Sequence, residues 1–236
     1  MKKALRNRII LIFIFLICII GCSKKDDPIP NSDDIWDIET KGIPKFVNTN
    51  FIEIIRIYRI SKYRSAVGHD YSDASEQCRS LKHYFEPKPD VDWTTVKIYS
   101  PVKGIVTRVE QEWAGVKLEI ESEQYPAFRL SIFHINTAKQ YNINDKVTEG
   151  EYLGTHISSQ TYSDISVIVN DPSKQGRMVS FFDVITDELF KEFSSRGLNS
   201  RSDAIIPKAL RDANPLTCNG DTFTSTDTIE NWVYLK

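Results

Sequence analysis

The sequence predicts a mainly β (α+β) protein, with a compact antiparallel β-sandwich or barrel-like core and a helical C-terminal extension. Between Tyr99 and Asn170, short runs alternate apolar and polar residues, which is the period of a half-buried strand. The apolar positions are Val116, Leu118 and Ile120, then Phe128, Leu130 and Ile132. Residues that reverse the chain separate the runs; they are Ala114-Gly115, Gln124-Tyr125-Pro126, Asn144-Asp145 and Thr148-Glu149-Gly150. Strands this short suit a small sandwich or barrel.

The N-terminus carries an export signal. Four basic residues precede an apolar run over residues 9–20, which is shorter than the roughly 20 residues of a membrane span. Residues 1–21 therefore predict a signal peptide. The following Ile19-Ile20-Gly21-Cys22 resembles a bacterial lipobox, which implies that Cys22 is acylated, becomes the mature N-terminus and attaches the protein to the membrane. A non-lipidated signal or a membrane anchor is the alternative. We expect a lipid-anchored protein of the bacterial cell envelope, at the outer membrane.

Residues 22–34 are polar and contain proline, which predicts a disordered tether. Removal of residues 1–21 would take away four of the 30 basic residues and leave 26 against 32 acidic ones, a net charge of about −6. This charge provides no basic field to hold nucleic acid. The expected partner is peptidoglycan, another glycan or an envelope protein.

Two cysteines remain for the mature domain. Cys18 lies in the signal peptide and Cys22 would carry lipid, so Cys78 and Cys218 are the only thiols left. An oxidising compartment favours a disulfide between them. Two separate buried thiols are the alternative.

The rest of the chain predicts one domain over 35–236, with its core at 69–170 and its extension at 171–236. Residues 35–64 are compatible with a strand or a short helix packed on the core edge, and 75–84 has a helical pattern. Residues 180–196 predict an amphipathic helix. A shorter helix is expected from Pro207 to Asn214, and a last strand near Trp232.

A set of motifs within this core resembles the lysostaphin-like zinc endopeptidases, which cut peptidoglycan cross-links. The motifs are Pro101-Val102-Lys103-Gly104-Ile105-Val106, Phe133-His134-Ile135, Asp145-Lys146-Val147, Leu153-Gly154-Thr155 and the His-x-x-x-Asp element from His69 to Asp73. In that family, the His-x-x-x-Asp element supplies two zinc ligands. The resemblance therefore implies that His69 and Asp73 bind zinc; a structural pair that caps a loop is the alternative.

The third zinc ligand of the family comes from a His-x-His pair, and here the chain departs from the pattern. At the matching place it has Asp164 and Ser166, which the strand period puts on one face with Ile165 and Val167 on the other. Ser is a poor zinc ligand, whereas Asp164 can coordinate zinc as carboxylates do. The resemblance also implies a catalytic, water-orienting role for His134 and Asp164; for His134 a core histidine is equally compatible.

Two functions follow from this resemblance. The favoured one is a peptidase-like core with a degenerate metal site, which acts as a non-catalytic binding or scaffold module for peptidoglycan or an envelope partner. The other is a zinc metallopeptidase that acts on peptidoglycan peptides through His69, Asp73 and Asp164, with His134 assisting. The two remaining histidines, His83 and His156, are expected to be packing or surface residues, or else to fill the missing ligand position.

Overall fold

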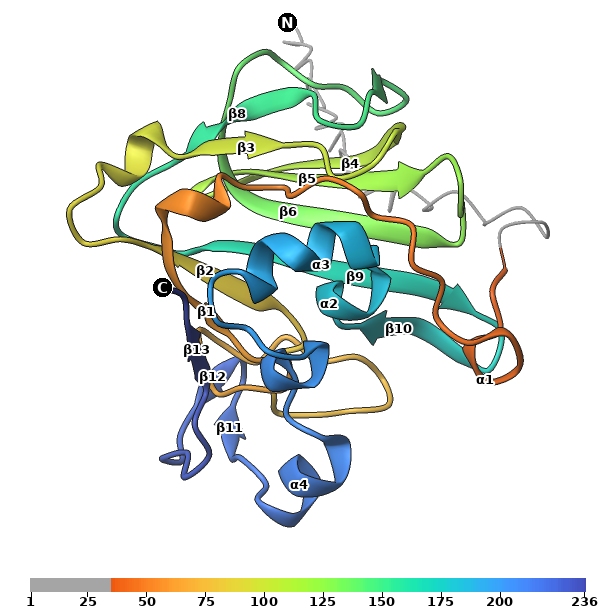
Figure 1. Ribbon diagram of the computed structural model, residues 1–236. Helices are drawn as coiled ribbons and strands as arrows, with labels where there is room; N and C mark the ends of the chain where they lie inside the picture. The colour runs from red at the N-terminus through yellow and green to blue at the C-terminus, as the bar shows by residue number, and fades with distance from the viewer. Residues whose placement is uncertain (1–34) are drawn as a thin grey trace, which may run out of the picture.

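A computed structural model describes residues 35–236, and its main element is one 11-stranded sheet (Figure 1). Its strands are β1 (Ile57–Ser61), β2 (His83–Pro87), β3 (Lys97–Tyr99), β4 (Gly104–Glu112), β5 (Gly115–Ser122), β6 (Phe128–Thr137), β7 (Lys146–Val147), β8 (Tyr152–His156), β9 (Ser163–Asp171), β10 (Lys174–Val179) and β13 (Trp232–Tyr234). The main path runs β13-β1-β2-β9-β6-β5-β4-β7, while β10 pairs with β9 and β8 pairs with β6 and β3. The mainly antiparallel β class is confirmed. Among the described strands, however, no pairing closes the sheet into a barrel.

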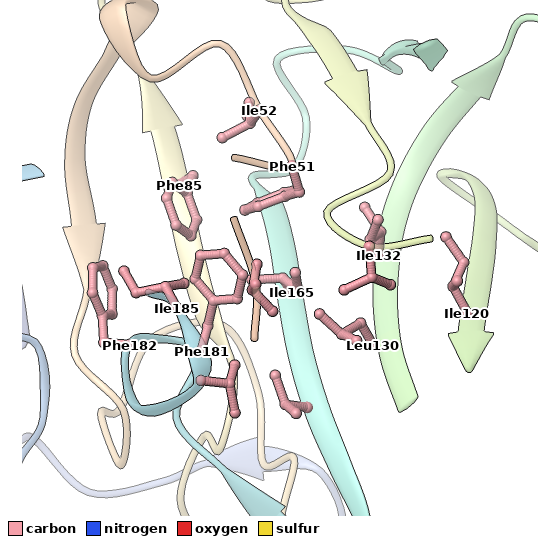
Figure 2. Packing of buried hydrophobic residues seen from close by; sticks show 14 of the residues in the cluster. Phe51, Ile52, Phe85, Ile120, Leu130, Ile132, Ile165, Phe181, Phe182 and Ile185 are labelled. Carbon is pink, nitrogen blue, oxygen red and sulfur yellow. The ribbon is translucent and has the colours of Figure 1, made fainter. Parts of the chain in front are cut away.

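The hydrophobic core lies against one face of this sheet. The predicted alternation holds over the central strands, where Leu130 and Ile132 of β6 and Ile165 and Val167 of β9 are fully buried. Phe51, Phe181 and Phe182, from segments outside the sheet, pack over that face together with Phe85 of β2 (Figure 2). Phe51 packs edge-on against Phe85 at 4.8 Å and against Phe181 at 5.9 Å between ring centroids. Strands before residue 69 and after residue 170 therefore belong to the same sheet and core as those between.

The predicted long helix over 180–196 is instead two helices, α2 (Phe181–Val184) and α3 (Asp187–Ser194). The break is at Ile185, which is extended and forms a parallel bridge to Val47. Thr186 then caps α3, because its hydroxyl accepts a hydrogen bond from the Leu189 amide at 3.3 Å. A tertiary strand contact thus interrupts a sequence that is amphipathic throughout.

Other expectations had mixed outcomes. The short helix α4 (Lys208–Ala213) and the last strand β13 are present as predicted. Residues 35–64 contain both alternatives, namely α1 (Ile38–Lys41), a 3-10 turn at Ile54–Arg56, and β1. The helix predicted over 75–84 is wrong, because this segment forms turns and then enters β2 at His83.

The predicted disulfide between Cys78 and Cys218 is confirmed, with 5.8 Å between the Cα atoms. It joins the irregular segment before β2 to β11 (Cys218–Asn219), which forms a small hairpin with β12 (Thr222–Phe223). The predicted signal peptide, the lipidation site Cys22 and the tether over 22–34 lie outside the described residues. Within 35–236, none of the helices has the length and apolar character to cross a bilayer.

Candidate functional site

A β-bulge in β6 determines where His134 points. Val116 of β5 pairs with Ile135 and Leu118 pairs with Ile132, so the single residue Lys117 faces two residues of β6. One of these, His134, has a φ of 61°, which is uncommon for a residue other than glycine. The bulge shifts the alternation by one residue, so that Ile135, not His134, continues the buried apolar face. His134 is thereby displaced from the core face that strict alternation assigned to it.

Asp164 and Ser166 lie on β9 away from the apolar core, as the strand period predicted. Their neighbours Ile165 and Val167 are in the hydrophobic cluster, whereas Asp164 and Ser166 are not. Both polar residues are nevertheless almost fully buried. The Asp164 Oδ1 and Ser166 Oγ atoms have no hydrogen-bond partner among the described residues, so this polar patch is incompletely satisfied.

The centre of the site is Lys82, which the sequence did not single out. Its ammonium lies 2.6 Å from Asp164 Oδ2 and 3.4 Å from His69 Nε2. Three aromatic rings surround the same Nζ atom, with their centroids at 4.4 Å (Tyr71), 5.2 Å (Tyr84) and 4.0 Å (Phe133). Burial is the largest single influence on the pKa of Lys82 and lowers it, but the charge and hydrogen bond of Asp164 together with Tyr84 and Tyr71 outweigh burial, and the pKa is raised. The ammonium is therefore charged throughout the ordinary pH range.

His69 and Asp164 thus meet through this ammonium. His69 Nδ1 is 2.9 Å from the Asp70 carbonyl oxygen, to which only a protonated Nδ1 can donate. A neutral ring then presents its bare Nε2 to Lys82, which donates to it. His69 Nε2 and Asp164 Oδ2 are thus both directed at Nζ.

Asp73, the third predicted ligand, has a different role. Its Oδ2 accepts a hydrogen bond from the Met178 amide at 2.9 Å, and its Oδ1 accepts from the amides of Ser75 and Glu76 at 2.7 and 3.0 Å. Asp73 therefore shapes the turn that leads to Cys78 and holds it against β10. Its two oxygens are used by backbone amides, so Asp73 caps the turn without His69, which contacts Asp70 and Lys82 instead.

These residues do not fit zinc. Catalytic zinc needs three protein ligands and an open position, but over residues 35–236 no three His, Cys, Asp or Glu side chains are grouped so that they could hold a metal ion. The expected set of His69, Asp73 and Asp164 is not assembled, because backbone amides take Asp73 and the Lys82 ammonium takes the other two. A fixed positive charge in this place also repels a metal cation.

His134 and Asp164, the predicted catalytic pair, do lie together. His134 Nε2 is 3.2 Å from Asp164 Oδ1 and its Nδ1 is 3.0 Å from the Ala114 carbonyl oxygen. The Nε2 contact lacks hydrogen-bond geometry, since Oδ1 has no partner. His134 Nδ1 donates its proton to the Ala114 carbonyl, so the neutral ring has a bare Nε2. The contact between Nε2 and Asp164 Oδ1 is therefore attractive only when Nε2 also carries a proton.

A groove of about 310 Å³ opens over these groups. Its walls come from the segment before β2, the β4–β5 hairpin and the bulge in β6, and its lining residues are His69, Tyr71, Lys82, Glu112, Trp113, Lys117, Phe133 and His134. Sequence reasoning missed Lys82, Lys117, Glu112 and Trp113. Of these, only Trp113 could have been noticed in the sequence. It precedes the turn residues Ala114-Gly115, where a large apolar side chain is unusual, and the structure shows it exposed.

The other two histidines are packing residues. His83 contacts the Ser61 carbonyl oxygen through Nδ1 and the Ser180 hydroxyl through Nε2, both at 2.8 Å. Burial lowers the pKa of His83 to about 4. His156 Nε2 lies 2.9 Å from the Thr161 carbonyl oxygen, and burial lowers its pKa as well. Neither histidine lines the groove.

No family model matches the chain, and neither does any curated protein. Three solved structures show how far its similarity to known folds extends. The SpoIIQ–SpoIIIAH pore-forming complex matches at 11% identity over 63% of this chain and 96% of that chain, with a TM-score of 0.43. Csd3 of Helicobacter pylori matches at 16% identity over 67% of this chain and 41% of that chain, also with a TM-score of 0.43. The M23 metalloprotease pseudoalterin matches at 16% identity over 59% of this chain and 75% of that chain, with a TM-score of 0.36.

The similar structures thus include M23-type peptidases. They do not assign this chain to a family. Identities of 16% or less with TM-scores below 0.5 transfer no activity, metal or partner to it, so the function has to be argued from the groove itself.

Proposed function

We propose that this protein is a lipid-anchored binding or scaffold module of the bacterial cell envelope, and that the groove over Lys82 recognises peptidoglycan or an envelope protein without cleaving it. One observation carries the proposal. The Lys82 ammonium occupies the space between His69 Nε2 and Asp164 Oδ2, where a shared metal ion would have to be bound.

This ammonium does not replace a metal chemically. A zinc hydrolase needs a metal-bound water with a pKa near 7 and an open coordination position. A lysine whose pKa is raised holds its proton, so it acts neither as a general base nor as a nucleophile at neutral pH. What Lys82 offers is a fixed positive charge and N–H donors, which are means of binding.

The sequence and the disulfide support the envelope location. The basic start, the apolar run over 9–20 and the lipobox-like end at Cys22 favour lipidation, and the disulfide between Cys78 and Cys218 suits an oxidising compartment. Metabolic palmitate labelling of the full chain tests this directly. We expect label in the wild type and none in Cys22→Ser, with the labelled protein in the outer-membrane fraction. An unlabelled wild type would refute the lipid anchor.

Metal analysis separates binding from hydrolysis. The untagged wild type and the variants His69→Ala and Lys139→Ala, purified without chelator, would be assayed for zinc by mass spectrometry. Lys139 is an exposed control that pairs with Glu151 outside the groove. We expect zinc far below one equivalent in all three proteins. One equivalent in the wild type and in Lys139→Ala, lost in His69→Ala, would support a metallopeptidase instead.

A further inference from the structure

The proposed binding function leaves the chemistry of the ligand open, and the charges around the groove restrict it. Two lysines approach the same aromatic ring, with Lys82 Nζ at 4.0 Å and Lys117 Nζ at 5.1 Å from the Phe133 centroid. The two side chains are 2% and 11% exposed, and both residues line the groove. The groove therefore has two ammonium groups close to one ring.

Each of these ammonium groups has donors to spare. An ammonium carries three N–H bonds. Lys82 directs one at Asp164 and one at His69, while Lys117 donates to Glu110 at 2.8 Å and has no other hydrogen bond among the described residues. Buried donors without acceptors are costly. An oxygen-rich anionic group of a ligand, such as a carboxylate, would satisfy them.

Glu112 supplies the opposite charge. Its side chain is 29% exposed and lies 3.7 Å from His134 Nδ1, a contact that is longer than a hydrogen bond. The neighbouring acid, Glu110, is paired with Arg108 at 2.9 Å as well as with Lys117. Glu112 is thus the acid of the groove that no Lys or Arg pairs within the described residues. It shares the His134 ring with the indole of Trp113, which is 79% exposed and lies 6.5 Å from that ring between centroids. A carboxylate beside an exposed indole suits an organic ammonium group.

The groove is balanced in charge and small in volume. Counted together with the ion-pair partners Asp164, Glu110 and Arg108, the lining residues Lys82, Lys117 and Glu112 give three positive and three negative charges, so a ligand of net charge zero adds no uncompensated charge. About 310 Å³ is at the lower end for ligand sites, and Tyr71, Phe133 and Trp113 offer apolar surface. These features together describe a small ligand with one cationic end, one anionic end and an apolar body.

We propose that the groove binds a zwitterionic amino-acid-like ligand. Its carboxylate accepts hydrogen bonds from Lys82 and Lys117, its ammonium group pairs with Glu112 beside Trp113, and its apolar side chain packs on the aromatic walls. This inference rests on the proposed binding function and names the chemical class that the same site takes.

Three matched probes test it by calorimetry and NMR titration of the full chain. Phenylalanine carries both charges, N-acetylphenylalanine only the carboxylate, and phenylalanine amide only the ammonium. We expect phenylalanine to bind at least tenfold more tightly than either single-charge probe. Alanyl-phenylalanine, in which the two charges are further apart, distinguishes the source: tighter binding than phenylalanine identifies a peptide, and weaker binding a free amino acid.

Two variants test which residue binds the carboxylate and which binds the ammonium group of the ligand. Lys117→Met should abolish the preference for phenylalanine over phenylalanine amide, and Glu112→Gln should abolish the preference for phenylalanine over N-acetylphenylalanine. Lys103→Met is the matched control, because Lys103 pairs with Glu123 on the surface and does not line the groove; it should leave all affinities unchanged. If Lys117→Met fails to fold, Glu112→Gln, which alters an exposed side chain, still decides the matter.

The inference is overturned if the wild type binds none of the probes at millimolar concentration, if it binds all of them equally, or if the preferences survive both substitutions. These outcomes are separate from a failure of the proposed function, which would appear as bound zinc in the assay above. If the protein binds neither zinc nor the zwitterionic probes, the proposed binding function stands and only the proposed ligand class is wrong.

Discussion

Lys82 and Asp164 face each other at 2.6 Å inside the protein, and their side chains are only 2% and 0% exposed. The pair joins the segment before β2 to β9 and holds Lys82 where it lines the groove. Removing one partner leaves a buried, uncompensated charge, which costs about 3–5 kcal/mol. We expect Lys82→Met and Asp164→Asn each to lower the free energy of unfolding by that amount.

The double variant Lys82→Met/Asp164→Asn leaves no buried charge. Its loss in free energy of unfolding should therefore be smaller than the sum of the two single losses, by about 1 kcal/mol or more. Urea denaturation of the four proteins measures this coupling. Additive losses would mean that the two groups do not form an ion pair in solution.

His83 should make stability depend on pH. Its pKa is about 4 in the folded protein, because it is buried, against an ordinary value of 6.5. As pH falls below 6.5, His83 binds a proton in the unfolded chain but not in the folded protein. The stability that His83 contributes above pH 6.5 is therefore lost as pH falls toward 4. The loss can reach about 3 kcal/mol for this group.

The comparison that isolates His83 is the free energy of unfolding of the wild type and His83→Gln between pH 7 and pH 4. His156, whose pKa burial also lowers, contributes in the same direction to both proteins. The wild type should lose more stability than the variant over this range. Parallel pH profiles would exclude His83 as the source.

The disulfide should contribute most of what holds the C-terminal hairpin against the site. Cys78 and Cys218 are 140 residues apart in sequence, and in the chain-entropy model the closure of a loop this long stabilises the folded state by about 5 kcal/mol. We expect Cys78→Ala/Cys218→Ala to unfold at a much lower denaturant concentration. Dithiothreitol should reproduce the effect in the wild type and do nothing to the variant; equal midpoints with and without reductant would contradict this account.

Gly115 is required at the hairpin opposite the bulge. Its φ is 93°, and a Cβ there would lie 2.9 Å from the Ile135 carbonyl oxygen and 3.2 Å from the His134 carbonyl carbon. Gly115→Ala should therefore cost about 1–3 kcal/mol and displace the His134 ring, which NMR would detect as shifted ring signals. Gly176→Ala is the control, since its φ is 67° but a Cβ would meet nothing within 4 Å; the two variants should differ clearly in melting temperature.

Much of the fold could be predicted because it depends on local patterns. Alternation in β6 and β9 predicted which residues enter the core, and Pro207 predicted the start of α4 within one residue. The long helix over 180–196 could not be predicted correctly, because the bridge from Ile185 to Val47 that divides it joins residues far apart in sequence. The same applies to the wrong helix over 75–84, where turns that include Asp73 replace it.

The sequence by itself determined the β class, the pairing of the two remaining cysteines and the face of β9 on which Asp164 and Ser166 lie, since each depends on residue type and a period of two. Only the tertiary structure decided the site. Lys82 meets Asp164 because β2 pairs with β9 in one particular register, and His134 turns toward the groove because a bulge adds one residue to β6. Register and bulges are set by contacts between distant segments, so the position of the Lys82 ammonium between His69 and Asp164 could not be seen before the strands were assembled.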